Sequence, residues 1–183
     1  PSERTYTVPE FLDALAEQGL SFGRWFHQAP YRPQCGAPAT TPHAARLAEL
    51  NDVDQYTAME LVRGSMARHT VIAHDATATN ARHSGGWVED SIPIRLPDAI
   101  TVEERLPPGA AAVLINTAHT DTDLVLAVTS AEKRLVDKID GHRTLSEIAA
   151  NAGAHLGSPD GAIGGLFERL WLWDQVVFNQ SHT

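Results

Sequence analysis

The segment INTAHTDTDLVL, residues 115–126, carries the residue types best suited to chemistry in this chain. His119, Asp121 and Asp123 alternate there with threonines. In a β-strand, alternate side chains point to one face. An imidazole and two carboxylates on one face would suit a metal ion or acid–base catalysis. The threonines are also typical of a strand end or a turn, where such side chains cap nearby backbone groups. We favour this structural role over a metal or catalytic one.

An aromatic segment, WFHQAPY, forms a second candidate site. Its residues Trp25, His27 and Tyr31 follow a predicted strand, and loops at strand ends often bind ligands in α/β proteins. These side chains are therefore candidates to line a substrate pocket. The alternative is a loop that covers the core, because large aromatic side chains bury readily, and we favour this alternative.

Cys35 is the only cysteine of the chain. An intramolecular disulfide and a thiolate zinc cluster are therefore both excluded. The thiol could serve as a nucleophile beside a histidine, but its sequence surroundings show no helix N-terminus that would lower its pKa. A structural role is the better interpretation.

Near the C-terminus, GAIGGLFERLWLW is a strongly apolar predicted helix. Arg169 is its only basic residue, so it is poorly suited to contact nucleic-acid phosphates. The net charge of −9 also argues against a nucleic-acid partner. The helix instead indicates a surface for docking on protein, with four candidate residues: Leu166, Phe167, Leu170 and Trp171.

Helix-start signals divide the first half of the chain into elements. Thr7 and Glu10 form a capping box, and a helix follows it up to Gly19. The strand LSFGRWF comes next, so the start of the chain predicts an αβ unit. A proline-rich loop then leads to a helix over 55–67, capped by Asp54, and to the strand HTVIAH. The small polar residues 75–86 are the best linker candidate.

The second half is predicted to contain strands first and helices later. Strands at 110–116 and 123–128 flank the His119 segment. Capping boxes then start helices over 130–140 and 145–152, Ser158 and Pro159 start a third helix, and DQVVFN is a closing strand. Three short helices followed by a strand indicate a winged-helix-like domain.

These elements predict an α+β fold in three parts. Residues 1–36 form a remnant αβ unit, residues 37–128 a mixed α/β accessory region, and residues 129–183 a winged-helix-like three-helix domain. A composition with 43% apolar and 20% charged residues allows packed cores. No apolar run approaches the roughly 20 residues that a membrane span needs. With a single cysteine and no signal-peptide pattern, we expect a cytoplasmic protein without a membrane partner.

Two longer stretches, YTVPEFLDALAEQGLSFGRWFHQAPYRPQCG (6–36) and DQYTAMELVRGSMARHTVIAHD (54–75), resemble a family of bacterial class I S-adenosylmethionine-dependent methyltransferases. The segments at 107–126 and 131–149 are similar to later parts of the same family. The resemblance implies that residues 6–26 end a Rossmann-like catalytic sheet and that the rest is an accessory, substrate-side region. The family's glycine-rich cofactor loop has no counterpart here. We therefore expect no cofactor bound by this chain, which is inactive alone, and a preceding catalytic domain that binds S-adenosylmethionine.

Two other functions stay open on the sequence. One is a free-standing winged-helix module that binds a peptide or a protein partner, which the acidic composition and the aromatic third helix favour. The other is a metal-dependent hydrolase built on His119, Asp121 and Asp123. The sequence indicates neither the methyl acceptor nor the oligomeric state.

Overall fold

A computed structural model describes residues 5–77, 90–153 and 162–179. The chain forms two compact units, residues 1–83 and residues 84–183. The predicted linker at 75–86 begins at the end of the last strand of the first unit, and its residues 78–86 lie outside the described part of the chain. The two units are described separately below.

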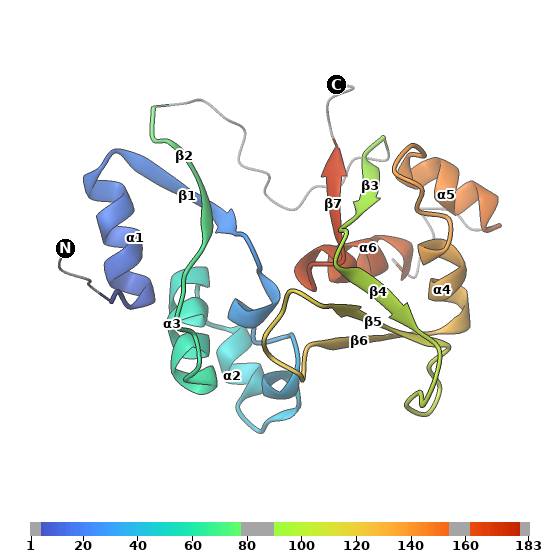
Figure 1. Cartoon of the computed structure of the whole chain (residues 1–183), viewed down its shortest axis with the longest axis horizontal. Helices are drawn as coiled ribbons and strands as arrows, with labels where there is room; N and C mark the ends of the chain where they lie inside the picture. The colour runs from blue at the N-terminus through green and yellow to red at the C-terminus, as the bar shows by residue number, and fades with distance from the viewer. Residues whose placement is uncertain (1–4, 78–89, 154–161, 180–183) are drawn as a thin grey trace. The chain divides into compact units, whose positions relative to one another are not determined.

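The first unit combines short helices with a two-stranded antiparallel ladder (Figure 1). Its elements, in chain order, are α1 (Val8–Glu17), β1 (Leu20–Trp25), the 3-10 turns η1 (Ala29–Tyr31) and η2 (Ala37–Thr40), α2 (Ala44–Ala48), α3 (Asp52–Arg63) and β2 (Val71–Asp75).

The helix–strand unit at the start of the chain is confirmed. The Thr7 backbone N–H donates to the Glu10 carboxylate at 2.9 Å, as expected at the start of α1. The helix ends at Glu17 with Gln18 as its C-cap, and Gly19 follows with φ +70°, a left-handed conformation that glycine adopts without strain. This residue turns the chain directly into β1.

β1 pairs with β2 in an interrupted register. Leu20 lies opposite Asp75 and Trp25 opposite Val71, but the pairing shifts between Phe22 and Arg24. Gly23 lies at this irregularity. A Cβ atom there would come within 2.6 Å of the His74 ring nitrogen, so the bulge brings the strands too close together for any side chain at this position.

The start predicted for α3 was wrong by several residues. Asn51, and not Asp54, caps the helix, because its side chain accepts the backbone N–H of Asp54 at 3.0 Å. Asp54 lies within the first turn. The helix ends before Gly64, which has φ +62°, and so does not reach residue 67 as predicted.

The described residues of the second unit form two small antiparallel sheets and three helices (Figure 1). Its elements are β3 (Ile92–Arg95), β4 (Ala99–Val102), β5 (Ala112–Asn116), β6 (Val125–Val128), α4 (Ser130–Val136), α5 (Leu145–Asn151), α6 (Ala162–Leu172) and β7 (Val176–Asn179). β4, β5 and β6 form one sheet in that order, and β3 pairs with β7.

One hydrophobic core holds the second unit together. Its strand members are Ala112, Leu114, Leu126, Val128 and Val176, and its helix members include Leu135, Ile148 and Phe167. The domain boundary predicted after Val128 falls within this shared core. The predicted first helix over 130–140 is shorter in the structure, because α4 ends at Val136.

The capping boxes predicted for α4 and α5 are present. Glu132 and Glu147 accept the backbone N–H groups of Thr129 and Thr144 at 2.8 and 2.9 Å. The start predicted for the third helix, Ser158 and Pro159, lies outside the described residues. β7 closes the chain as predicted, and its partner β3 comes from before residue 129.

The expected α+β class is therefore confirmed, with short helices and small antiparallel sheets in both units. The winged-helix likeness of residues 129–183 stays a prediction. Of the helices in the described ranges, none has the length and apolarity needed to cross a membrane.

Candidate functional site

The His119 segment does not form the strand that would align its side chains. Residues 117–124 are the connection between β5 and β6, made of turns and irregular backbone. The alternation of His119, Asp121 and Asp123 therefore does not place their side chains on one face of a strand. The turn that we favoured for this segment describes its backbone correctly. Within the described parts of the chain, Asp121 and Asp123 join no group of three side chains that could hold one metal ion.

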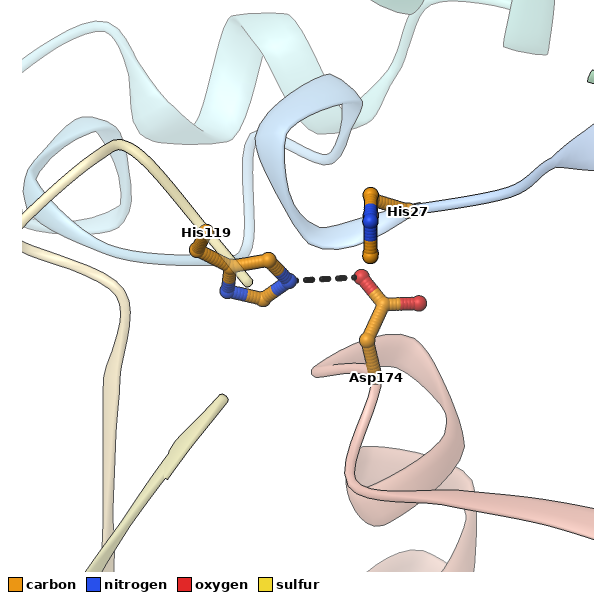
Figure 2. A group of neighbouring side chains, drawn as sticks. All are labelled: His27, His119 and Asp174. Atoms are coloured by element: carbon orange, nitrogen blue, oxygen red, sulfur yellow. Dashed lines mark hydrogen bonds and ion pairs between the residues drawn. The ribbon is translucent and has the colours of Figure 1, made fainter. Parts of the chain in front are cut away.

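His119 instead pairs with a residue that the sequence did not single out. Its Nε2 lies 3.1 Å from Oδ2 of Asp174, 55 residues later in the chain (Figure 2). The two side chains are 2% and 0% exposed. Figure 2 also labels His27, a residue of the first unit. The pair joins the β5–β6 connection to the turn between α6 and β7.

The backbone of Asp174 explains where this carboxylate points. The Asp174 N–H donates to the Trp171 carbonyl and the Gln175 N–H to the Leu170 carbonyl, at 3.1 and 2.8 Å. This pattern is a Schellman motif, which ends a helix with one left-handed residue. Asp174 is that residue, with φ +52°. Glycine is usual there, so the aspartate side chain must offset some backbone strain.

Asn116 fixes the same turn from the opposite side. Its Nδ2 donates to the Asp174 carbonyl at 2.6 Å, and its Oδ1 accepts the Ala118 N–H at 3.0 Å. Asn116 is itself buried. The three polar residues Asn116, His119 and Asp174 thus form one buried network between two connections of the second unit.

The chemistry of the His119–Asp174 pair follows from its hydrogen bond. An ionised carboxylate only accepts, so the ring proton is placed on Nε2 of His119 and the basic lone pair on Nδ1. A carboxylate that orients an imidazole in this way is the arrangement found behind general bases and metal-binding histidines. The burial of both side chains makes it equally suitable as a structural link.

The aromatic candidates of the first unit lie in its core. The Trp25 and Tyr31 rings are stacked with centroids 4.0 Å apart and planes 7° apart, and both residues are buried. Phe22 and Tyr56 both pack edge-on against Trp25. Because the rings fill the space between them, the packing supports the core-covering interpretation of this segment. His27 lies outside this stack, with its ring against that of Phe26 at 4.9 Å.

A chain of hydrogen bonds runs behind this aromatic core. The Tyr31 hydroxyl lies 2.8 Å from Nδ1 of His69, and Nε2 of His69 lies 3.2 Å from the Glu60 carboxylate. The other Glu60 oxygen accepts the Val8 N–H at 2.9 Å. Since the carboxylate must accept, Nε2 of His69 donates to Glu60, and in this tautomer Nδ1 accepts the tyrosine hydroxyl proton. The chain thereby links η1, α3, α1 and the start of β2.

Burial alters the acidity of the tyrosines in this core. It raises the pKa of Tyr31 above the usual value near 10, and the nearby Glu60 charge raises it further. Burial is also the main reason that the pKa of Tyr56 is raised. Both tyrosines therefore stay protonated at neutral pH, and neither is prepared to act as a base.

Cys35 has the structural surroundings expected from its sequence. The residue is completely buried, and its carbonyl accepts Nη2 of Arg63 at 3.3 Å. Arg63 also donates from Nε to the Pro30 carbonyl at 2.9 Å. Arg63 of α3 therefore holds the proline-rich loop in place through two of its backbone carbonyls.

The docking surface predicted on α6 is wrong. Leu166, Phe167 and Leu170 are almost completely buried in the core of the second unit, and Trp171 packs partly buried against it. The apolar face of α6 packs within the core of its own unit, so Leu166, Phe167 and Leu170 are not available to a partner. The sequence correctly indicated an apolar helix face, but we expected that face to bind a partner, whereas it packs in the core of its own unit.

Sequence reasoning singled out His119 and Tyr31 but missed their hydrogen-bond partners, for different reasons. His69 and Glu60 lie in segments that read as an ordinary strand and helix, and no local pattern marks them. Asp174 did leave a signal, since an aspartate directly after the apolar helix end LWLW occupies the position where a helix usually takes glycine. The chain matches no protein-family model.

Proposed function

We propose that this chain is the C-terminal accessory, substrate-side region of an S-adenosylmethionine-dependent methyltransferase and is not catalytic by itself. The proposal starts from the resemblance of residues 6–36 and 54–75 to that family. On this proposal, S-adenosylmethionine binds to a catalytic domain that precedes this region in the intact, cytoplasmic protein.

One structural observation carries the proposal: the α1–β1 unit is attached to a sheet of only two strands. Within the described residues, β1 and β2 pair with each other and with no third strand. Two-stranded ladders are marginal by themselves, whereas helix–strand units usually belong to larger sheets. A helix and strand at the end of a larger sheet are what the resemblance implies for residues 6–26.

The residues of this chain do not fit the cofactor. Class I methyltransferases hold S-adenosylmethionine on a glycine-rich loop after a strand, as the resemblance implies. Here Gly164 and Gly165 lie within α6, and the preceding element among the described residues is the helix α5. The aromatic core of the first unit is closed by ring stacking. The cofactor therefore belongs to the other domain in this proposal.

Calorimetry with S-adenosylmethionine on two proteins tests the proposal. The intact protein encoded by the whole reading frame is expected to bind the cofactor, and this chain alone to give no binding heat. Micromolar binding by this chain alone would contradict the assignment of the cofactor to another domain. Absence of binding by both proteins would contradict the methyltransferase assignment itself.

A further inference from the structure

The three-stranded sheet of the second unit is apolar on both faces. Residues that lie directly opposite each other in neighbouring strands point to the same face. The register therefore places six side chains on the face turned away from the core, namely Ile100, Val102, Val113, Ile115, Val125 and Ala127. All six are aliphatic. We call this surface the outward face of β4, β5 and β6, the three strands that Figure 1 labels.

The outward face is separate from the core of its own unit. Ile100 and Val125 are 44% and 43% exposed, Ala127 is exposed, and the other three residues are half-buried. None of the six belongs to the core cluster, whose strand residues lie on the opposite face. Antiparallel sheets usually place one face on the core and polar residues on the other. This sheet does not follow that pattern.

The chemistry of the six side chains restricts what can cover them. None carries a charge or a hydrogen-bonding group, so a partner gains only from the burial of apolar surface. A charged partner group placed there would lose its hydration and find no counter-charge. The occupant must therefore present an uncharged, mainly aliphatic surface of its own.

The size of the face favours an occupant on the same polypeptide. With strands about 4.8 Å apart and about 3.4 Å per residue, two rows on three strands cover on the order of 200 Å². Stable complexes of separate chains bury about 800 Å² on each partner. A covalently linked domain needs much less, because its effective concentration reaches about the millimolar range. Two copies of this chain would also repel each other, since each carries a net charge of −9.

We propose that the outward face of β4, β5 and β6 is the surface on which the catalytic domain of the same polypeptide docks. The inference rests on the proposed function and names the contact through which the accessory region would act. It also gives the docking role to a surface other than α6, whose apolar residues are used in the core.

Carbene footprinting of the intact protein and of this chain tests the inference, because photogenerated carbenes label exposed aliphatic side chains. Peptides that contain residues 100–102, 113–115 and 125–127 are expected to be labelled severalfold less in the intact protein. Leu61, an exposed residue of α3, serves as the reference. Protection of the Leu61 peptide without protection of the sheet peptides would overturn the inference.

A double substitution provides the second part of the test. Val113→Thr with Ile115→Thr keeps β-branched side chains but replaces a methyl group of Val113 and the ethyl group of Ile115 by hydroxyls at the centre of the outward face. We expect the melting temperature of this chain to change little and the labelling of the intact variant to return towards that of the isolated chain. Ile72→Thr, at an exposed strand position of the first unit, is the matched control and should leave the protection unchanged.

The outcomes separate this inference from the proposed function. If the intact protein binds S-adenosylmethionine but its sheet peptides are labelled as in this chain, the docking surface is wrong and the function stands. If no cofactor binds, the function fails, and the proposed occupant fails with it. Protection that appears in this chain alone as its concentration rises would identify a second copy as the occupant and overturn the choice made here.

Discussion

Asp174 combines an unfavourable backbone conformation with a buried hydrogen bond to His119. Replacing Asp174 with glycine relieves about 1 kcal/mol of left-handed strain. It also removes a hydrogen bond to a charged group, which contributes about 1.5–3 kcal/mol. The hydrogen bond is the larger effect, so we expect Asp174→Gly to lower the free energy of unfolding by about 1 kcal/mol in urea titrations.

Arg105 provides the matched control for this prediction. It has φ +54°, nearly the same conformation as Asp174, but its side chain is exposed. Arg105→Gly should therefore stabilise the protein by up to about 1 kcal/mol. If both glycine variants stabilise the protein to the same extent, the Asp174 carboxylate does not contribute to the fold.

Tyr31 makes the first unit sensitive to alkaline pH. Because burial raises its pKa in the folded state, the unfolded chain loses the tyrosine proton first, from about pH 10 upwards. The stability contributed by the protonated form is therefore complete below that pH and falls above it, by about 1.4 kcal/mol per pH unit.

The variant Tyr31→Phe separates this effect from packing. At pH 7 it loses the hydrogen bond to His69, which costs about 0.5–1.5 kcal/mol. At pH 11 the variant no longer carries the ionisation penalty, so its deficit should shrink towards zero. Urea titrations at the two pH values measure this change. A deficit that is the same at both values would mean that Tyr31 ionises equally in the folded and unfolded chain.

The side-chain partnerships at this scale were the least predictable part of the molecule. His119 was a candidate because of Asp121 and Asp123, its neighbours in sequence, but its partner Asp174 arrives from the far end of the unit. Trp25 and Tyr31 were grouped with His27 as one candidate segment because they lie close together in the sequence. Spacing in the sequence identifies local partners, whereas the tertiary fold alone determines distant ones.

Among the strands, β1 depends on Gly23 at its bulge. A Cβ atom at this position would lie 2.8 Å from the Ile72 carbonyl oxygen and 2.6 Å from the His74 ring. We expect Gly23→Ala to destabilise the protein by about 1–3 kcal/mol, as overpacking of a tight site does. Ser21→Ala on the same strand is the control and should stay within about 0.5 kcal/mol.

A second substitution identifies the contact responsible. The His74 ring is the end of a side chain and can move, but the Ile72 carbonyl belongs to the backbone. The double variant Gly23→Ala with His74→Ala should therefore recover only part of the lost stability. Complete recovery would show that the strands can separate at the bulge without cost.

α6 carries two glycines that its position in the fold does not require. A Cβ atom at Gly165 meets nothing within 4 Å, and the residue is exposed within the helix. Gly165→Ala should stabilise the protein by about 0.5–1 kcal/mol, because alanine loses less conformational freedom in a helix. Thermal unfolding measures the change.

Gly153 tests whether open space alone decides the outcome. A Cβ atom there also meets nothing within 4 Å, but the backbone has φ +70°. Gly153→Ala should therefore destabilise the protein although it touches nothing. Equal effects at Gly153 and Gly165 would contradict the assignment of these two backbone conformations.

Helix starts were predicted correctly where the sequence signal was complete within a few neighbouring residues. The capping boxes at Thr7, Thr129 and Thr144 were read correctly because each is complete within four residues. The start of α3 was missed because Asn51 and Asp54 are both good caps, and only the backbone decides between them. The segment at 117–124 has the alternation of a strand, but aspartate and threonine-rich sequences also suit turns.

For the molecule as a whole, the membership of the second unit depended on pairings that no local signal encodes. β3 and β7 come from opposite ends of the second unit, and their register joins Ile92 to Asn179. The core likewise combines strands before residue 129 with helices after it. The composition predicted that cores would form, but not which segments would share one.

The balance between acidic surface and apolar outward face determines how the molecule behaves near its isoelectric point. At pH 7 the net charge of −9 keeps copies apart. Near pH 5.4, the isoelectric point, this repulsion disappears and exposed apolar surface drives association. We expect a solubility minimum there, measured by precipitation with polyethylene glycol.

The double variant Val113→Thr with Ile115→Thr should be more soluble at pH 5.4, and its solubility should be unchanged at pH 7, where charge repulsion dominates. Ile72→Thr should change neither value. If the double variant gained solubility at pH 7 alone, charge repulsion would not be what prevents the outward faces of two copies from associating.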